Sequence, residues 1–158
     1  MSKHSLILES KAAWDEYFLS MLPVIAKKSK DKHTQVGCVI VGPDHEIRST
    51  GYNSLVRGLK DNVPTRLERP EKYKWIEHAD RNAIYNAARM GTSVNNCTMY
   101  LPWYPCIDCA RAIISAGITD LVIGRATFEE RLKADTYIGD REVAITMFNE
   151  CGVKVRFV

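Results

Sequence analysis

Three side chains have the types and the spacing of a zinc site. Cys106 and Cys109 lie in the segment PCIDC, and His78 lies in the segment EHAD. A catalytic zinc ion takes three protein ligands and leaves a fourth position for water, and one His with two Cys is such a set. Both segments open a helical pattern, where free N–H groups and the helix dipole stabilise thiolates. The sequence therefore predicts that two helix N-termini face one metal ion.

Two other interpretations of the cysteine pair stay open. A Cys-x-x-Cys pair also occurs in thioredoxin-like redox sites, but there it usually follows a strand early in the fold. A purely structural zinc site needs a fourth Cys or His. No paired ligand spacing marks the remaining candidates, which are Cys97, Cys38, His33 and His45. Cys38 and Cys151 are expected to be small buried side chains.

Helix and strand patterns alternate along the chain and must position these residues. Helical spacing of apolar residues covers 11–26, 78–89, 106–116 and 141–151. Strand-like runs lie at 34–41, 47–53, 98–101, 121–123 and 153–157. The first two runs are expected to form a hairpin, and Pro23 should bend or shorten the first helix. Alternation of strands and helices predicts a largely parallel sheet covered by helices.

The size and composition of the chain predict one globular domain over residues 1–158. The chain has 158 residues, of which 46% are hydrophobic and 26% are charged, and this balance supports a single core. The stretch 54–76 is polar and contains Gly58, Pro64 and Pro70. Some twenty residues of this kind inside a compact domain are usually a functional loop, so this loop is a candidate lid.

The charge and the hydropathy of the chain limit the kinds of molecule that it is expected to bind. The net charge of +3 is mild and the basic residues are spread out, which argues against bulk nucleic-acid binding and suits a small phosphorylated ligand. The N-terminus lacks a signal-peptide run, and no window has the length of a membrane-spanning helix. Five cysteines without a disulfide-scaffold spacing fit a reducing compartment. We therefore expect a cytoplasmic protein without a membrane partner.

Several segments together point to a known family. SKDKHTQVGCVIV, GYN, EHADRNAI and PCIDCARAIISAGI follow one another between about residues 29 and 123. The pattern His-x-acid followed by Pro-Cys-x-x-Cys is the signature of zinc nucleobase deaminases. The order and spacing of the segments resemble the deoxycytidylate (dCMP) deaminases of the zinc-dependent cytidine and deoxycytidylate deaminase superfamily. The resemblance implies an α/β fold, a three-layer α/β/α sandwich around a mixed five-stranded sheet.

The resemblance also implies a reaction and roles for single residues. The reaction would be hydrolysis of the 4-amino group of dCMP to give dUMP and ammonia, with one zinc ion per chain held by His78, Cys106 and Cys109. The acid that moves protons would be Asp80. The substrate would contact the backbone N–H of Ala79 and the side chain of Asn53, although a turn role for this asparagine is an equal alternative. For the phosphate group the candidates are Lys30, Lys32, Arg57 and Arg66.

Asp80 departs from the family pattern, in which this acid is a glutamate. Aspartate is shorter by one methylene, or about 1 Å, and an error of that size in a reacting group can cost on the order of 10² in rate. Three explanations compete: the helix lies closer to the metal, the enzyme is slow, or the protein binds zinc and nucleotide without turnover. A deaminase that acts on tRNA, on another polynucleotide or on a modified base is a further alternative.

Regulation and assembly follow only from the resemblance. Family members that are regulated by deoxycytidine and thymidine triphosphates commonly have Gly directly after GYN and Pro two residues later, whereas this chain has Ser54 and Val56 there. Allosteric control by triphosphates therefore stays open. The loop 54–76 has neither Cys nor His for a second zinc. The family forms dimers or hexamers through its helices, and the exposed helix after ISAG together with the segment RATFEERLKADTY at 125–137 is a candidate surface for a homo-oligomer.

Overall fold

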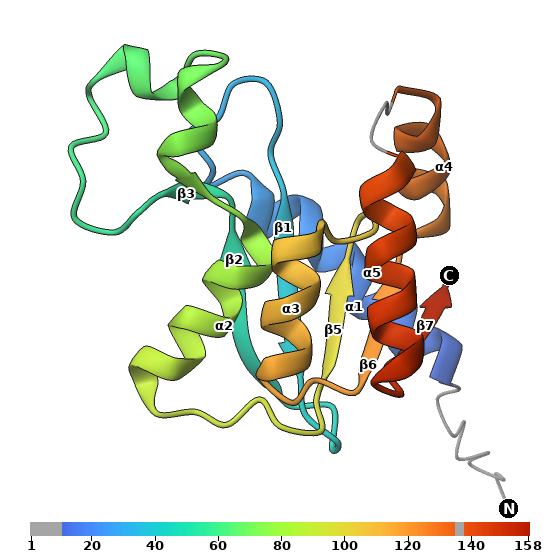
Figure 1. Cartoon of the computed structure of the whole chain (residues 1–158). Coiled ribbons are helices and arrows are strands. Elements are labelled where there is room, and N and C mark those ends of the chain that lie inside the picture. The colour runs from blue at the N-terminus through green and yellow to red at the C-terminus, as the bar shows by residue number, and fades with distance from the viewer. Residues whose placement is uncertain (1–10, 135–137) are drawn as a thin grey trace, which may run out of the picture.

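A mixed five-stranded sheet forms the centre of the protein. The computed structural model describes residues 11–134 and 138–158, and in these residues the strand order is β2–β1–β5–β6–β7 (Figure 1). The strands are β1 (Gly37–Val41), β2 (Ile47–Tyr52), β5 (Thr98–Leu101), β6 (Asp120–Ile123) and β7 (Lys154–Phe157). β1 pairs antiparallel with β2 and with β5, whereas β5, β6 and β7 run parallel. The mixed sheet confirms the resemblance and corrects the largely parallel pairing, because the hairpin reverses β1.

Helices cover both faces of this sheet, which gives the three layers. In Figure 1, α2 (Ala79–Met90), α3 (Ile107–Ser115) and α5 (Ile138–Glu150) lie in front of the sheet, and α1 (Lys11–Ala26) lies behind it. β1 is buried at every position because alternate side chains enter two cores. Cys38 and Ile40 join the cluster under α2, α3 and α5, while Val39 and Val41 join the one under α1.

α1 continues through Pro23, so the expected shortening of the helix is wrong. The helix runs on to Ala26. Leu22 and Ala26, on either side of the proline, are both buried against the sheet. Tertiary packing of the last turn thus outweighs the hydrogen bond that a proline removes.

The long loop at 54–76 is held by a strand pair at its base and by an ion pair of one of its lysines. β3 (Ser54–Leu55) pairs antiparallel with β4 (Ile76–Glu77) and closes the loop at its base. Between them lie the short 3-10 turns η1 (Pro64–Leu67) and η2 (Glu71–Lys74). Within η2, Lys72 is buried and its Nζ lies 2.5 Å from the carboxylate of Asp31. The role of the loop as a lid stays a prediction.

α4 (Arg125–Ala134) was not expected as a separate helix from the sequence. Its apolar residues are few, so its periodic signal is weak. Figure 1 shows that α4 and the long loop rise above the same end of the sheet, on opposite sides. Of the predicted oligomer surface at 125–137, positions 135–137 lie outside the described residues, as does the N-terminus at 1–10. Among the described helices, none has the length and apolar character needed to cross a membrane.

Candidate active site and metal centre

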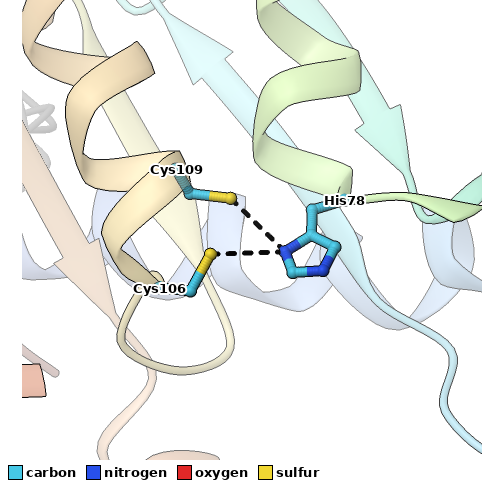
Figure 2. A group of neighbouring side chains, drawn as sticks. All are labelled: His78, Cys106 and Cys109. Atoms are coloured by element: carbon cyan, nitrogen blue, oxygen red, sulfur yellow. Dashed lines mark hydrogen bonds between the residues drawn. The ribbon is translucent and has the colours of Figure 1, made fainter. Parts of the chain in front are cut away.

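The structure brings together the three residues that the sequence singled out as metal ligands. The Nδ1 atom of His78 lies 3.6 Å from the Sγ atom of Cys106 and 3.4 Å from that of Cys109. All three ligand atoms lie within 4.8 Å of one another. Figure 2 shows the two sulfurs, from α3, pointing at the imidazole at the start of α2.

These distances fit a tetrahedral zinc ion. Zn–S bonds of about 2.3 Å and Zn–N bonds of about 2.0 Å, at a tetrahedral angle, put sulfur and nitrogen ligands about 3.5 Å apart. The two measured S···N distances match that edge. Two soft sulfurs and one imidazole are also a donor set that suits zinc. The residues therefore fit the metal, and three protein ligands leave one coordination position for water or substrate.

Helix starts position the ligands. His78 is the residue before the first turn of α2 and Cys106 the residue before the first turn of α3, and both have extended backbone conformations. The side chain of His78 makes no capping hydrogen bond to the N–H groups of α2, so its imidazole is available to a metal. Cys109 lies one turn further along α3, on the same side as Cys106. Pro105 precedes the pair, as expected at a helix start.

The electrostatics of the cluster favour a cation. A hydrogen bond from Cys109 lowers the pKa of Cys106 to about 3, against the effect of burial. The hydrogen bond with Cys106, burial and the nearby Asp80 raise the pKa of Cys109 far above its ordinary range. The hydrogen bond with Cys106 also raises the pKa of His78, although burial opposes it. A divalent cation bound between the two sulfurs would stabilise both as thiolates.

Asp80 reaches the metal group despite its short side chain. It lies in the first turn of α2 and is 6% exposed. Its carboxylate lies 2.9 Å from the Sγ atom of Cys109 and accepts a hydrogen bond from the N–H of Arg81. Burial raises the pKa of Asp80, against the hydrogen bond from Cys109. The acid therefore stands directly beside a ligand atom.

A close contact between α2 and β2 sets the position of this helix. A Cβ atom on Gly51 would lie 2.2 Å from the carbonyl oxygen of Ala79 and 2.4 Å from the backbone nitrogen of Ala83. Only glycine lets the backbones approach so closely. Because Ala79 lies between His78 and Asp80, this contact fixes the start of the helix that carries the ligand and the acid.

The metal group lies in the wall of a cavity of about 430 Å³. His78, Ala79, Asp80, Cys106 and Asn53 all line it, as the sequence predicted for a shared site. The side-chain amide of Asn53 donates to the carbonyl of Thr34 and accepts from the N–H of Val36, each at 2.8 Å. Asn53 thus holds the cavity wall together, and its contact with a substrate stays a prediction.

The basic residues expected to bind phosphate lie elsewhere. The described wall of the cavity contains none of Lys30, Lys32, Arg57 and Arg66. Lys30 and Arg57 line a second cavity of about 470 Å³, next to the outer side of α2. The guanidinium of Arg66 lies over the ring of Trp75, 4.4 Å from its centroid. The expectation for these four residues is therefore not supported by the geometry.

Sequence reasoning missed much of the cavity wall. Aromatic and basic residues form its outer part, namely Tyr73, Trp103, Tyr104, Phe128, Arg69, Arg131 and Arg141. Trp103 and Tyr104 directly precede PCIDC, so their place beside the cysteines was a usable signal. Arg131 and Arg141 come from α4 and α5 and carry no such signal, because only the packing of these helices brings them to the cavity.

The chain is similar to known deaminases over most of its length. A family model described as "Cytidine and deoxycytidylate deaminase zinc-binding region" matches residues 12–125. Human deoxycytidylate deaminase is 34% identical over 148 residues, which are 90% of this chain and 78% of that protein. An uncharacterized deaminase in the luxG 3′ region of Aliivibrio fischeri is 32% identical over 145 residues, 92% of this chain and 93% of that one. The deoxycytidylate deaminase of Pongo abelii is 38% identical over 114 residues, and the chain spans 63% of its length.

A solved structure shares the fold. The dCMP deaminase of cyanophage S-TIM5, crystallised in complex with dCMP and dUMP, superposes with a TM-score of 0.73 at 20% identity. The match covers 94% of this chain and 99% of the phage chain. The family match, the identities and the fold agree with the ligand geometry described above. The chain belongs to the cytidine and deoxycytidylate deaminase family that carries this zinc-binding region.

Proposed function

We propose that the protein is a zinc-dependent hydrolase that deaminates dCMP to dUMP and ammonia. The observation that carries the proposal is the contact of the Asp80 carboxylate with the tetrahedrally spaced group of His78, Cys106 and Cys109 in a cavity wall. The names of the relatives, deoxycytidylate deaminases from human and other animals, support the choice of substrate. The phage dCMP deaminase, which was crystallised with dCMP and dUMP and shares the fold, supports it as well.

The chemistry needs a nucleophile, a proton carrier and an anchor for the base. When bound, zinc supplies a water molecule that is acidic enough to lose a proton near neutral pH. The Asp80 carboxylate would take this proton and deliver it to N3 of the cytosine ring as the water oxygen bonds to C4. It would then take the second proton of that oxygen and pass it to the amine as the bond between C4 and the amine nitrogen breaks. The N–H of Ala79 belongs to the first turn of α2, where such groups have no partner within the helix, so it can donate to the base carbonyl.

The cavity walls would hold the substrate during these steps. Half-buried aromatic side chains would shield the base from bulk water, which strengthens the hydrogen bonds to it. Tyr104 and Trp103 lie beside the ligand cysteines and offer ring faces to a planar base. The amide of Asn53 lines the same cavity, and we propose that its remaining hydrogen-bonding capacity meets the sugar.

Ammonia release from dCMP by zinc-loaded protein tests the proposal. The variant Asp80→Asn should lower kcat by about 10²- to 10⁴-fold, the range of general acid–base catalysis. Asp108→Asn is the matched control, because Asp108 lies between the two ligand cysteines in sequence but is exposed and pairs with Arg111. Its kcat should stay within about twofold of the parent. A parent-like rate in Asp80→Asn would show that the assigned mechanism is wrong.

A second candidate is a weakly active or non-catalytic homologue that binds zinc and nucleotide. The aspartate at position 80, where the family has glutamate, favours it. This candidate predicts dUMP binding to zinc-loaded protein without ammonia release from dCMP, CMP, dCTP or deoxycytidine. A single domain over 1–158 and a location in the cytoplasm are further proposals that rest on composition, hydropathy and cysteine usage, and assembly into a dimer or hexamer is one that rests on the resemblance.

A further inference from the structure

One part of the wall of the cavity at the metal group is formed by the segment 29–36, with the sequence SKDKHTQV. Two of its residues, Asp31 and Thr34, line the cavity. The segment folds back on itself, because the carbonyl of Ser29 accepts a hydrogen bond from the side-chain amide of Gln35 at 2.8 Å. The proposed reaction gives this turn no task, although the turn lies beside the site of the reaction.

The carboxylate of Asp31 holds the turn together. Its Oδ1 atom accepts hydrogen bonds from the N–H groups of His33 at 2.9 Å and of Thr34 at 3.3 Å. Its Oδ2 atom accepts one from the ammonium group of Lys72 at 2.5 Å. Asp31 and Lys72 are each 3% exposed, so this ion pair is shielded from water. One carboxylate therefore fixes two pieces of the structure, the turn through one oxygen and the long loop through the other.

The turn determines the orientation of the Asn53 side chain. The carbonyl of Thr34 accepts a hydrogen bond from the Nδ2 atom of Asn53, and the N–H of Val36 donates to its Oδ1 atom, each at 2.8 Å. A side-chain amide has two N–H donors and an oxygen with two lone pairs, so Asn53 keeps a second donor and a second acceptor position. Thr34 is bound to Asp31 through its N–H and to Asn53 through its carbonyl. Asp31 and Asn53 are thus linked through a single residue of the backbone.

We propose that Asp31 is a positioning residue for the contact between Asn53 and the sugar of the substrate. This inference rests on the proposed function, in which the Asn53 amide meets the sugar of dCMP. Asp31 acts through Thr34 and has no contact of its own with the substrate. In a 2′-deoxynucleoside 5′-phosphate the free hydroxyl of the sugar is the 3′-hydroxyl, so this is the group that a correctly oriented amide recognises. Loss of the orientation should remove the preference for ligands that carry this hydroxyl.

The buried ion pair offers variants that separate positioning from stability. Asp31→Ala and Lys72→Met both break the pair, so both should lower the melting temperature. Only Asp31→Ala removes the acceptor of the two turn N–H groups, because in Lys72→Met the carboxyl group stays in place. Asp31→Asn keeps an oxygen that can accept from the same N–H groups, so it should resemble Lys72→Met. A purely structural role of the ion pair would give the three variants the same binding properties.

Binding of the product dUMP tests the proposal without any need for turnover. Calorimetry with zinc-loaded protein would compare dUMP with 2′,3′-dideoxyuridine 5′-monophosphate, which lacks the 3′-hydroxyl. The parent should bind dUMP about 3- to 10-fold more tightly, the effect of one hydrogen bond. Asp31→Ala should bind the two ligands with nearly equal affinity, whereas Asp31→Asn and Lys72→Met should keep the ratio of the parent.

Two further variants complete the test. Glu68→Gln is the surface control, because the Glu68 carboxylate lies 3.6 Å from the imidazole of His33 and connects the same loop and turn at exposed positions. It should keep both the melting temperature and the ratio of the parent. The double variant Asp31→Ala with Lys72→Met leaves no buried charge of the pair without a partner, so it provides folded protein where Asp31→Ala alone does not fold. The double variant should lose the ratio as Asp31→Ala does.

Three results would overturn the inference. The first is a parent that binds the two ligands equally, and the second is the parent ratio in Asp31→Ala or in the double variant. The third is a loss of the ratio in Lys72→Met as complete as that in Asp31→Ala, because both effects would then come from the broken ion pair.

The proposed function can fail separately. If the parent releases no ammonia from dCMP but shows the ratio and loses it in Asp31→Ala, the positioning role stands and the deaminase activity does not. If the parent deaminates dCMP while Asp31→Ala keeps the ratio, the activity stands and the positioning role is wrong.

Discussion

The Asp80 carboxylate reaches a proposed metal ligand although its side chain is one methylene shorter than a glutamate. Its contact of 2.9 Å with the Cys109 sulfur means that the first turn of α2 lies close to the ligands. Of the three explanations for an aspartate at this position, the geometry favours the first, in which the helix brings the shorter acid near enough. With the helix in this position, a glutamate would carry its carboxylate about 1 Å beyond the place that the aspartate holds.

Asp80→Glu should therefore reduce activity instead of raising it. The longer side chain would have to move its carboxylate away from Cys109 or displace the start of α2. Displacement of a reacting group by about 1 Å costs on the order of 10² in rate, so we expect a loss of kcat of that order for dCMP. Steady-state kinetics at equal zinc content would measure it. A kcat above that of the parent would instead show that the native aspartate is poorly placed.

A second residue-scale feature is the buried ion pair of Asp31 with Lys72. Burial alone would raise the pKa of Asp31, but hydrogen bonds from Lys72 and from the N–H groups of His33 and Thr34 together lower it. A carboxyl with a lowered pKa in the folded state stabilises the protein above its unfolded pKa of about 3.9. The contribution disappears as the pH falls through the still lower folded value.

Asp31→Asn should lower the free energy of unfolding by about 3–5 kcal/mol at pH 7, because the buried Lys72 ammonium loses its partner. The difference between variant and parent should shrink once the pH falls below about 4. Urea denaturation at pH 7 and at pH 3 would measure both values. Asp61→Asn is the control, since Asp61 pairs with Lys30 at the surface and should cost less. A difference that is equal at the two pH values would contradict the assignment.

At the scale of elements, two glycines set how closely helices lie on the sheet. Gly51 allows close contact of the sheet with α2, whose start carries His78 and Asp80. Gly37 allows close contact with α1, which carries none of the proposed site residues. A Cβ atom would clash equally severely at both positions. It would lie 2.2 Å from the carbonyl oxygen of Ala79 at Gly51, and 2.3 Å from the carbonyl oxygen of Leu22 at Gly37. The two positions thus form a natural pair for comparison.

Gly51→Ala and Gly37→Ala should both destabilise the fold, by about 1–3 kcal/mol for overpacking. Only Gly51→Ala should also weaken zinc binding, by about 10- to 100-fold, because it displaces the first turn of α2 and with it His78. Thermal unfolding would measure the stability, and competition with a chelator would measure the zinc affinity. Equal zinc affinity in the two variants would mean that the contact at Gly51 does not position the ligand.

On the scale of the whole molecule, the core does not depend on the metal group. Two apolar clusters fill the space on either face of the sheet. A polar network extends the apolar cluster under α1. In this network Asp15 of α1 accepts a hydrogen bond from the hydroxyl of Tyr100 and forms an ion pair with Arg156 of β7. These contacts join α1, β5 and β7 without any ligand of the metal site.

Zinc removal should therefore lower the melting temperature without unfolding the protein. A ligand that binds only the folded state adds about 2.7 kcal/mol at a hundred times its Kd. Calorimetric melting with chelator and with added zinc would show the shift, while circular dichroism would show retained helices. Cys38 is buried as expected, whereas the expectation of a buried Cys151 is wrong, because this residue is exposed at the end of α5. The variant Cys106→Ser should lose the zinc-dependent shift, whereas Cys151→Ser should keep it. Complete unfolding on chelation would contradict an independent core.

Local signals in the sequence determined the main strands and helices and, through the resemblance, the family, and they predicted which residues would act as metal ligands and as the acid. Helix starts and alternating strands depend on residues a few positions apart, so these features could be predicted. The tertiary structure decided the direction of β1, the separate helix α4, the continuation of α1 past Pro23, and which arginines reach the cavity. These features depend on contacts between segments far apart in the chain. No local pattern in the sequence indicates which distant side chains will line the same cavity.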